Sequence, residues 1–109
     1  MGTGEVDVLS TPRLIAMCEE ASCAALKGHL GNGRTSVASR VQFDHLVAVP
    51  VGGSVRAEAT LVRVEGRRLT FKISVMLHSG QGDRLVGAGR LSRVIVDEAA
   101  FMARASQSV

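Results

Sequence analysis

The segment STPRLIAMCEEASCAALKG, residues 10–28, decides the fold class of this chain. It begins like a helix, because Thr11 suits the N-cap and Pro12 suits the first helical position. Apolar side chains then recur around much of the circumference, which predicts a helix that is buried on several sides. Gly28 is the expected end of this helix.

From Thr35 the apolar residues recur at every second position, which is typical of strands. The alternation predicts four strands separated by glycine-containing turns, at residues 35–45, 54–65, 69–77 and 84–96. The pattern at residues 97–105 predicts a short terminal helix, with Phe101 and Met102 as its apolar contacts. A long helix followed by four antiparallel strands in hairpin order predicts an α+β layer.

The length of 109 residues suits one domain with one hydrophobic core. We expect a flexible lead-in over residues 1–9, a single domain over residues 10–105 and a tail over residues 106–109. Gly87 and Gly89 share one face of the last strand and leave room for a close approach, which we assign to the helix. A four-stranded sheet also has open edges, and pairing with a second copy of the chain is one way to cover them.

The composition argues against several classes of function. The formal net charge is only +3 and 3% of the residues are aromatic, whereas a nucleic-acid surface needs a clustered basic face with stacking aromatics. No apolar run is long enough to span a membrane. Cys18 and Cys23 fit no metal-ligand spacing and are expected to be small buried side chains in a reducing cytosol. We therefore expect a cytoplasmic protein with no nucleic-acid, membrane or metal partner.

Three polar residues lie where a hydrolytic site could form. Glu19 has no basic neighbour three or four positions away, so it is either a general base in an apolar setting or a rim residue that reaches water. Glu20 has similar neighbours, and the pattern does not separate the two acids. His45 continues the inward, apolar face of its strand, as a catalytic base or as a core histidine with satisfied hydrogen bonds. Thr11 is either only the helix cap or a hydroxyl that orients water or attacks an acyl carbon beside the helix N-terminus.

These residues stand in a context that resembles a known family. The stretches STPRLIAMCEEA, VEGRRLTF and RVIVD resemble the opening helix, the central hairpin and the last strand of the fluoroacetyl-CoA thioesterase-like hotdog proteins. The region from Thr35 to Gly52 resembles their next strand and turn. The spacing of Thr11, Glu19 and His45 also matches the family pattern.

The resemblance implies a hotdog fold, in which an antiparallel sheet wraps a long central helix. The family has about one more strand before this helix, and we expect that first strand to be lacking or shortened here. It implies hydrolysis of a small or medium acyl-CoA thioester without a cofactor, with Thr11, Glu19 and His45 as the catalytic residues. It selects Glu19 over Glu20 and places the backbone N–H of Ala38 near the reacting carbonyl. The implied assembly is a homodimer or a tetramer. The alternatives are a non-catalytic hotdog protein that binds acyl-CoA or another ligand, and a hotdog hydratase.

Overall fold

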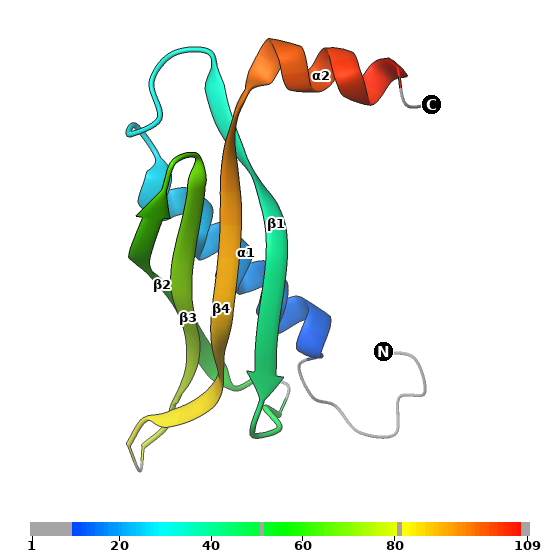
Figure 1. Ribbon diagram of the computed structural model, residues 1–109. Coiled ribbons are helices and arrows are strands. Elements are labelled where there is room, and N and C mark those ends of the chain that lie inside the picture. The colour runs from blue at the N-terminus through cyan, green and yellow to red at the C-terminus, as the bar shows by residue number, and fades with distance from the viewer. Residues whose placement is uncertain (1–9, 51, 81, 108–109) are drawn as a thin grey trace.

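The computed structural model describes residues 10–50, 52–80 and 82–107. The elements follow in the order α1 (Thr11–Leu26), β1 (Arg34–His45), β2 (Ser54–Glu65), β3 (Arg68–His78), β4 (Arg84–Asp97) and α2 (Glu98–Gln107). The strands form one antiparallel sheet, and α1 lies across one of its faces (Figure 1). The α+β class and the extents of the strands are confirmed. The expected lead-in at residues 1–9 lies outside the described residues.

The order of the strands differs from the predicted hairpin order. The sheet has the order β1-β4-β3-β2, so β1 pairs with β4 and not with β2. The connection from β1 to β2 explains the difference, because the N–H groups of Leu46 and Val47 both donate to the carbonyl of Val86 in β4, and Val49 is buried in the core. Alternation along a strand specifies its buried face, but it does not specify the neighbouring strand.

Two glycines of β4 mark the strand that lies beside it. A Cβ atom on Gly87 would overlap the ring of Phe43, and one on Gly89 would overlap the carbonyl oxygen of Gln42. Both of these neighbours belong to β1, so the expectation that α1 approaches the glycines is wrong. Glycine is needed because β1 itself occupies the space that a side chain would fill.

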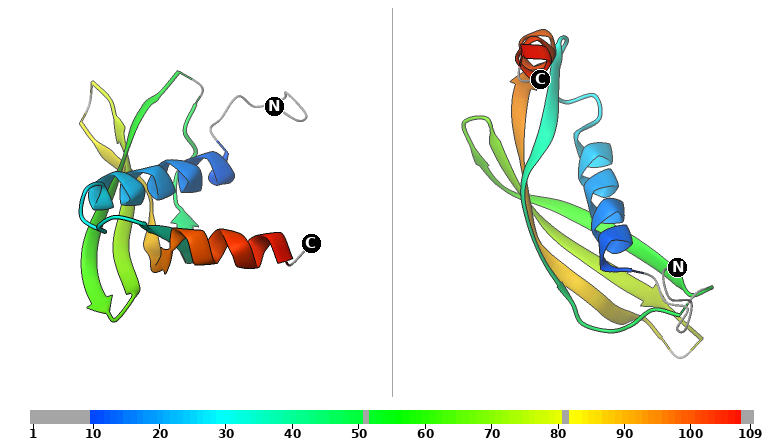
Figure 2. Two further views of the ribbon diagram at one scale, coloured as in Figure 1. Left: turned by 90° about the horizontal axis from the view of Figure 1, so that it is seen from above. Right: turned by 90° about the vertical axis from the view of Figure 1, so that its right-hand side faces the viewer.

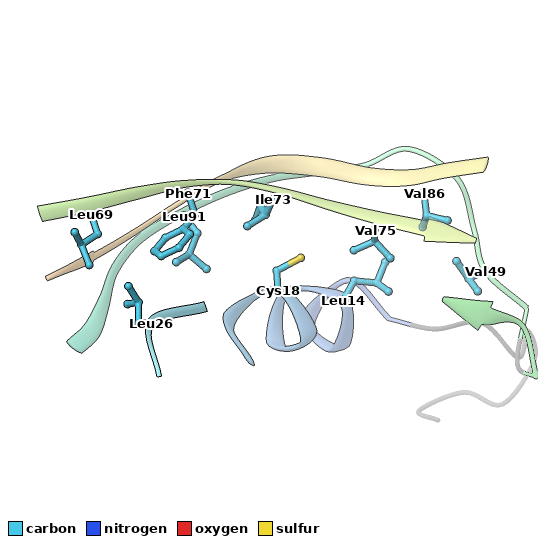
Figure 3. Packing of buried hydrophobic residues seen from close by; sticks show 10 residues of the cluster. All are labelled: Leu14, Cys18, Leu26, Val49, Leu69, Phe71, Ile73, Val75, Val86 and Leu91. Atoms are coloured by element: carbon cyan, nitrogen blue, oxygen red, sulfur yellow. The ribbon is translucent and has the colours of Figure 1, made fainter. Parts of the chain in front are cut away.

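The helix α1 and the sheet form two layers (Figure 2), and the side chains of the core lie between them (Figure 3). The buried residues of α1 are Leu14, Cys18, Ser22 and Leu26, which are spaced by four and form one stripe. The connection and the strands supply the other buried apolar residues, namely Val49, Leu69, Phe71, Ile73, Val75, Val86 and Leu91. Within one chain the buried residues of α1 lie along this one stripe, and Ile15, Met17 and Ala21 beside it are half-buried.

The second helix projects away from the sheet (Figure 1). It begins after Asp97, whose Oδ1 accepts the N–H of Ala100 at 2.9 Å, and it continues to Gln107, beyond the predicted end at residue 105. No described residue of α2 is buried, and Met102 is 57% exposed. No helix in the described part of the chain is long and apolar enough to cross a membrane.

Candidate active site

The start of α1 differs from the prediction in a way that matters for Thr11. The N-cap is Ser10, because its Oγ accepts the N–H of Arg13 at 3.3 Å and its carbonyl accepts the N–H of Leu14 at 3.1 Å. Thr11 is the first residue of the helix, so its hydroxyl is not used as a cap. Since Pro12 has no N–H, this helix start has few free donors for a substrate carbonyl.

The hydroxyl of Thr11 instead forms a hydrogen bond with His45, the last residue of β1. Thr11 Oγ1 lies 2.7 Å from Nδ1 of His45, and Nε2 of His45 lies 2.9 Å from the carbonyl oxygen of Val47. A carbonyl can only accept, so in the neutral imidazole Nε2 carries the proton and Nδ1 is the acceptor. The Thr11 hydroxyl therefore donates to His45. A hydroxyl bonded to a base that a third group orients is the arrangement of an activated nucleophile.

The surroundings of His45 fix its position. His45 lies opposite Gly87 in the β1–β4 ladder, and the ring of Phe43 fills the space above that glycine, with its centroid 6.5 Å from the His45 centroid. Val47, which orients the imidazole, donates its own N–H to Val86 at 3.2 Å. The base is therefore held through β4, which is a central strand of the sheet.

Glu19 lies in a different part of the chain. It follows Thr11 by eight residues, which is about 12 Å along the helix axis. Glu19 is half-buried, and its carboxylate makes no ion pair or hydrogen bond within the described ranges 10–50, 52–80 and 82–107. Glu20, by contrast, is exposed, with Oε1 at 3.6 Å from Nη1 of Arg13. The structure thus separates the two acids that the pattern could not, and Glu19 is the one without a counter-ion.

The two cysteines occupy opposite environments. Cys18 is fully buried, and this burial, together with the nearby charge of Glu19, raises the pKa of its thiol from 9.0 to about 11. Cys23 is exposed, so the expectation of two buried cysteines is wrong for this residue.

Ala38 lies far from Thr11 within one chain. It precedes His45 by seven residues of the same strand, a separation of about 20 Å. The register shifts between Ala38 and Arg40, so this bulge reverses the predicted alternation and places Ala38 opposite the buried Arg93. Ala38 therefore belongs to the face of the sheet that α1 covers.

Arg93 is a buried cation that the sequence reasoning missed. It is 6% exposed, and its hydrogen bonds run to Ser36 Oγ from Nε at 2.8 Å, to Ser36 O from Nη2 at 3.0 Å and to Ser22 Oγ from Nη1 at 3.4 Å. No carboxylate pairs with it in the described part of the chain. The alternation of Leu91, Arg93 and Ile95 carries the signal, because it places Arg93 between two inward apolar residues.

Two separate groups of polar residues result. The first, the Thr11–His45 pair, lies at the N-terminal end of α1. The second, the Glu19–Arg93 cluster, consists of Glu19, Ser22, Ser36 and Arg93 near the middle of α1. Ser22 connects Glu19 with Arg93 through hydrogen bonds. Its Oγ donates to the backbone carbonyl of Glu19 at 2.7 Å and accepts from Nη1 of Arg93 at 3.4 Å. Among the described residues, no group of three or more His, Cys, Asp or Glu side chains is arranged to hold a metal ion.

Several known proteins are similar to this chain in sequence and in fold. The sequence profile of the fluoroacetyl-CoA-specific thioesterase family matches residues 1–99. A fluoroacetyl-CoA thioesterase from Streptantibioticus cattleyicolor is 30% identical over 101 residues, which cover 93% of this chain and 70% of the relative. The solved structure of the fluoroacetyl-CoA thioesterase FlK is 29% identical, with a TM-score of 0.83 over 94% of this chain and 73% of that one. A hot-dog-like protein from Thermanaerovibrio acidaminovorans, 24% identical, has a TM-score of 0.85 over 94% of this chain and 73% of that one.

These likenesses confirm the hotdog fold and the resemblance found in the sequence. They also favour the catalytic interpretation over a non-catalytic binding protein, since the matched family consists of thioesterases. The chain therefore belongs to the family of fluoroacetyl-CoA-specific thioesterases.

Proposed function

We propose that this chain hydrolyses a small or medium acyl-CoA thioester at a site that two copies of the chain form together. Thr11 and His45 of one copy, with Glu19 and Ala38 of the other copy, would surround one thioester. The observation that carries the proposal is the 2.7 Å hydrogen bond between the Thr11 hydroxyl and Nδ1 of His45. It supplies a hydroxyl and a base, and the carboxylate and the N–H donor come from the second copy.

His45 acts as the general base. The proton moves from the hydroxyl to Nδ1, and the resulting imidazolium keeps its Nε2–H bond to the carbonyl of Val47. In one route Oγ1 of Thr11 attacks the acyl carbon, the CoA thiolate leaves, and water then hydrolyses the threonine ester. In the other route the hydroxyl holds a water molecule, which attacks while a proton passes to His45. Both routes give a carboxylate and CoA without a cofactor, and only the first gives a burst of CoA release before steady turnover.

Pairing of two β1 edges would bring the two groups of polar residues together. Because antiparallel strands run in opposite directions, a β1–β1 pairing centred near Val41 sets His45 of one copy opposite Ala38 of the other. Glu19 of that other copy follows, since its helix is tied to the same region through Ser22 and Arg93. The two-fold operation then forms two equal sites in a homodimer.

The second copy contributes charge and hydrogen bonding at the acyl group. The N–H of its Ala38 stabilises the carbonyl oxygen as negative charge develops there. Its Glu19, which has no counter-ion of its own, orients the attacking water. In the route through the threonine ester, Glu19 also accepts a proton from the water that hydrolyses the ester, while the proton held by His45 passes to the departing CoA thiolate. Its Arg93 adds a buried positive charge behind the reaction centre. We place this enzyme in the cytoplasm, because its two cysteines are free and one of them is exposed.

Thiol release from a panel of acyl-CoAs, including acetyl-CoA and fluoroacetyl-CoA, tests the proposal. Thr11→Ala, Glu19→Gln and His45→Ala are compared with the wild type, and Glu20→Gln serves as the control because its carboxylate lies at the surface beside Arg13. We expect His45→Ala to lower kcat by about 10²- to 10⁴-fold, and the control to keep its rate. Unchanged turnover in all three site variants would remove the proposed site.

A further inference from the structure

A hollow of about 180 Å³ lies on the outer face of the sheet, which is the face turned away from α1 (Figure 2). Its wall is formed by side chains of three neighbouring strands, namely Arg40 and Gln42 of β1, Arg90 and Ser92 of β4, and Thr70 of β3. Among the described residues, none of α1 or α2 lines it. Small-molecule sites usually have volumes of about 300–1,000 Å³, so this hollow has room for a small ion and not for a larger ligand.

The register of the strands places these side chains on one face. Arg90 and Ser92 lie on either side of the buried Leu91 in β4, so both point away from the core. Across the sheet, Ser92 lies between Arg40 of β1 and Thr70 of β3. This row of the outer face therefore supplies one cation and two hydroxyl groups to the hollow.

The next row brings two cations directly opposite each other. Lys72 of β3 pairs with Arg90 of β4, and side chains in such positions have Cβ atoms about 4.5–5.5 Å apart. Arg40 is diagonal to Arg90 across the β1–β4 ladder, at about 7–8 Å. These three outer-face cations, Arg40, Lys72 and Arg90, repel one another, and like charges so placed destabilise a sheet. An anion bound among them would remove this repulsion.

The carboxylates on the same face do not neutralise the outer-face cations. Glu58 and Glu65 of β2 lie beside other arginines, at 3.7 and 3.1 Å. Asp44 lies two residues beyond Gln42 on β1, opposite Ala88. Within the ranges 10–50, 52–80 and 82–107, none of the outer-face cations forms an ion pair. The hollow therefore combines uncompensated positive charge with room for an anion.

We propose that the outer-face cations bind a phosphate group, either as the free ion or on a small organic molecule. The guanidinium groups of Arg40 and Arg90 present forked donors to its oxygens, and the ammonium group of Lys72 adds a third positive charge. The hydroxyl groups of Ser92 and Thr70 donate from the floor of the hollow. A phosphate has enough acceptor oxygens to use donors from several directions at once, whereas a carboxylate has only two oxygens in one plane. This set of donors therefore fits a phosphate better than a carboxylate.

The site stays open in the proposed dimer. A β1–β1 pairing joins backbone groups, so it leaves the side chains of Arg40 and Gln42 on the outer face. A pairing centred near Val41 sets Arg40 of one copy opposite Gln42 of the other, and the two hollows then lie side by side. Each hollow is formed within one copy, so the binding of phosphate depends neither on this pairing nor on the proposed hydrolysis.

Calorimetric titration with inorganic phosphate tests the proposal. The ionic strength is held constant, because salt screens exposed charges. We expect the wild type to bind phosphate with a dissociation constant on the order of 1 mM, since exposed charge contacts are individually weak. The double variant Arg40→Gln/Arg90→Gln should bind it about 10-fold more weakly. The control Arg67→Gln/Arg84→Gln removes the same number of charges from exposed positions outside the hollow, and it should bind phosphate as the wild type does.

Two other ligands and one stability measurement complete the test. Acetate should bind the wild type at least about 10-fold more weakly than phosphate, because it offers fewer oxygens and less charge. Glycerol phosphate that binds as tightly as phosphate would identify a phosphomonoester as the ligand, and binding of phosphate alone would identify the free ion. Without phosphate, Arg40→Gln/Arg90→Gln should melt no lower than the wild type, because the repulsion is relieved, and phosphate should raise the melting temperature of the wild type alone of these two.

The proposal is overturned if Arg40→Gln/Arg90→Gln binds phosphate as tightly as the wild type, or if the control loses binding to the same extent. Equal binding of acetate and phosphate would also overturn it, because the hollow would then recognise negative charge and not a phosphate group.

Discussion

Two glycine-to-alanine substitutions should have opposite effects on stability, although they add the same methyl group. At Gly89 the new Cβ would overlap the carbonyl oxygen of Gln42 and lie 2.9 Å from Cα of Phe43, both in the backbone of β1. Backbone atoms of a paired strand cannot turn away as a side chain can, so β1 must separate from β4. Overpacking of this kind costs about 1–3 kcal/mol. At Gly80, in the β3–β4 connection, a Cβ has no atom within 4 Å and φ is not positive.

Gly80→Ala should therefore stabilise the chain by about 0.4–1 kcal/mol, because alanine restricts the unfolded state. The two variants should differ by about 1.4–4 kcal/mol, which corresponds to roughly 6 °C or more in Tm for a domain of this size. Thermal and urea unfolding at one fixed protein concentration measures the difference, since a dimer unfolds in a concentration-dependent way. Equal melting temperatures would refute the packing of β1 against β4, and with it the placement of His45.

Three further outcomes follow, two from buried groups and one from the exposed start of α1. The pKa of the Cys18 thiol is 9.0 in the unfolded chain and about 11 in the folded one, because burial disfavours the thiolate. The free energy of unfolding should therefore fall as the pH rises between these two values. Urea titrations of Cys18→Ala should lack that loss. Arg93→Met should change the free energy of unfolding by less than about 2 kcal/mol, because an unpaired buried charge adds little net stability, while kcat falls strongly. Ser10→Ala should cost about 1 kcal/mol of stability through loss of the N-cap, and an unchanged melting temperature would contradict that assignment.

The helices and strands could be predicted from the sequence because each produces a local periodicity of apolar residues. In β3 the residues Leu69, Phe71, Ile73 and Val75 alternate with polar neighbours, and all four are buried as that pattern requires. The sequence indicates less directly which strands pair with each other. Gly87 and Gly89 contain that information, but only the position of Phe43 shows that the close approach comes from β1 and not from α1.

The site could be predicted only in part. The alternation and helix start drew attention to Thr11 and His45, and these two are in contact. The choice between Ser10 and Thr11 as N-cap depends on a hydrogen bond that either side chain could make, so the sequence could not decide it. Arg93 was missed because a basic residue on a strand is ordinarily exposed. The bulge beside Ala38 has no signature in a single sequence, and it changes the face on which that residue lies.

The division of the site between two copies is most directly tested by mixing two inactive variants. Thr11→Ala and Glu19→Gln are purified separately, combined in equal amounts under conditions that allow subunits to exchange, and assayed for thiol release. A heterodimer of these variants contains one site in which Thr11, His45 and Glu19 are all intact. Because about half of the dimers are mixed and each has one such site, the mixture should recover about one quarter of wild-type activity. Thr11→Ala mixed with His45→Ala should recover none, since both changes lie in the same half of the site. If the first mixture stays as inactive as its components, or the control recovers equally, the two-copy site is contradicted.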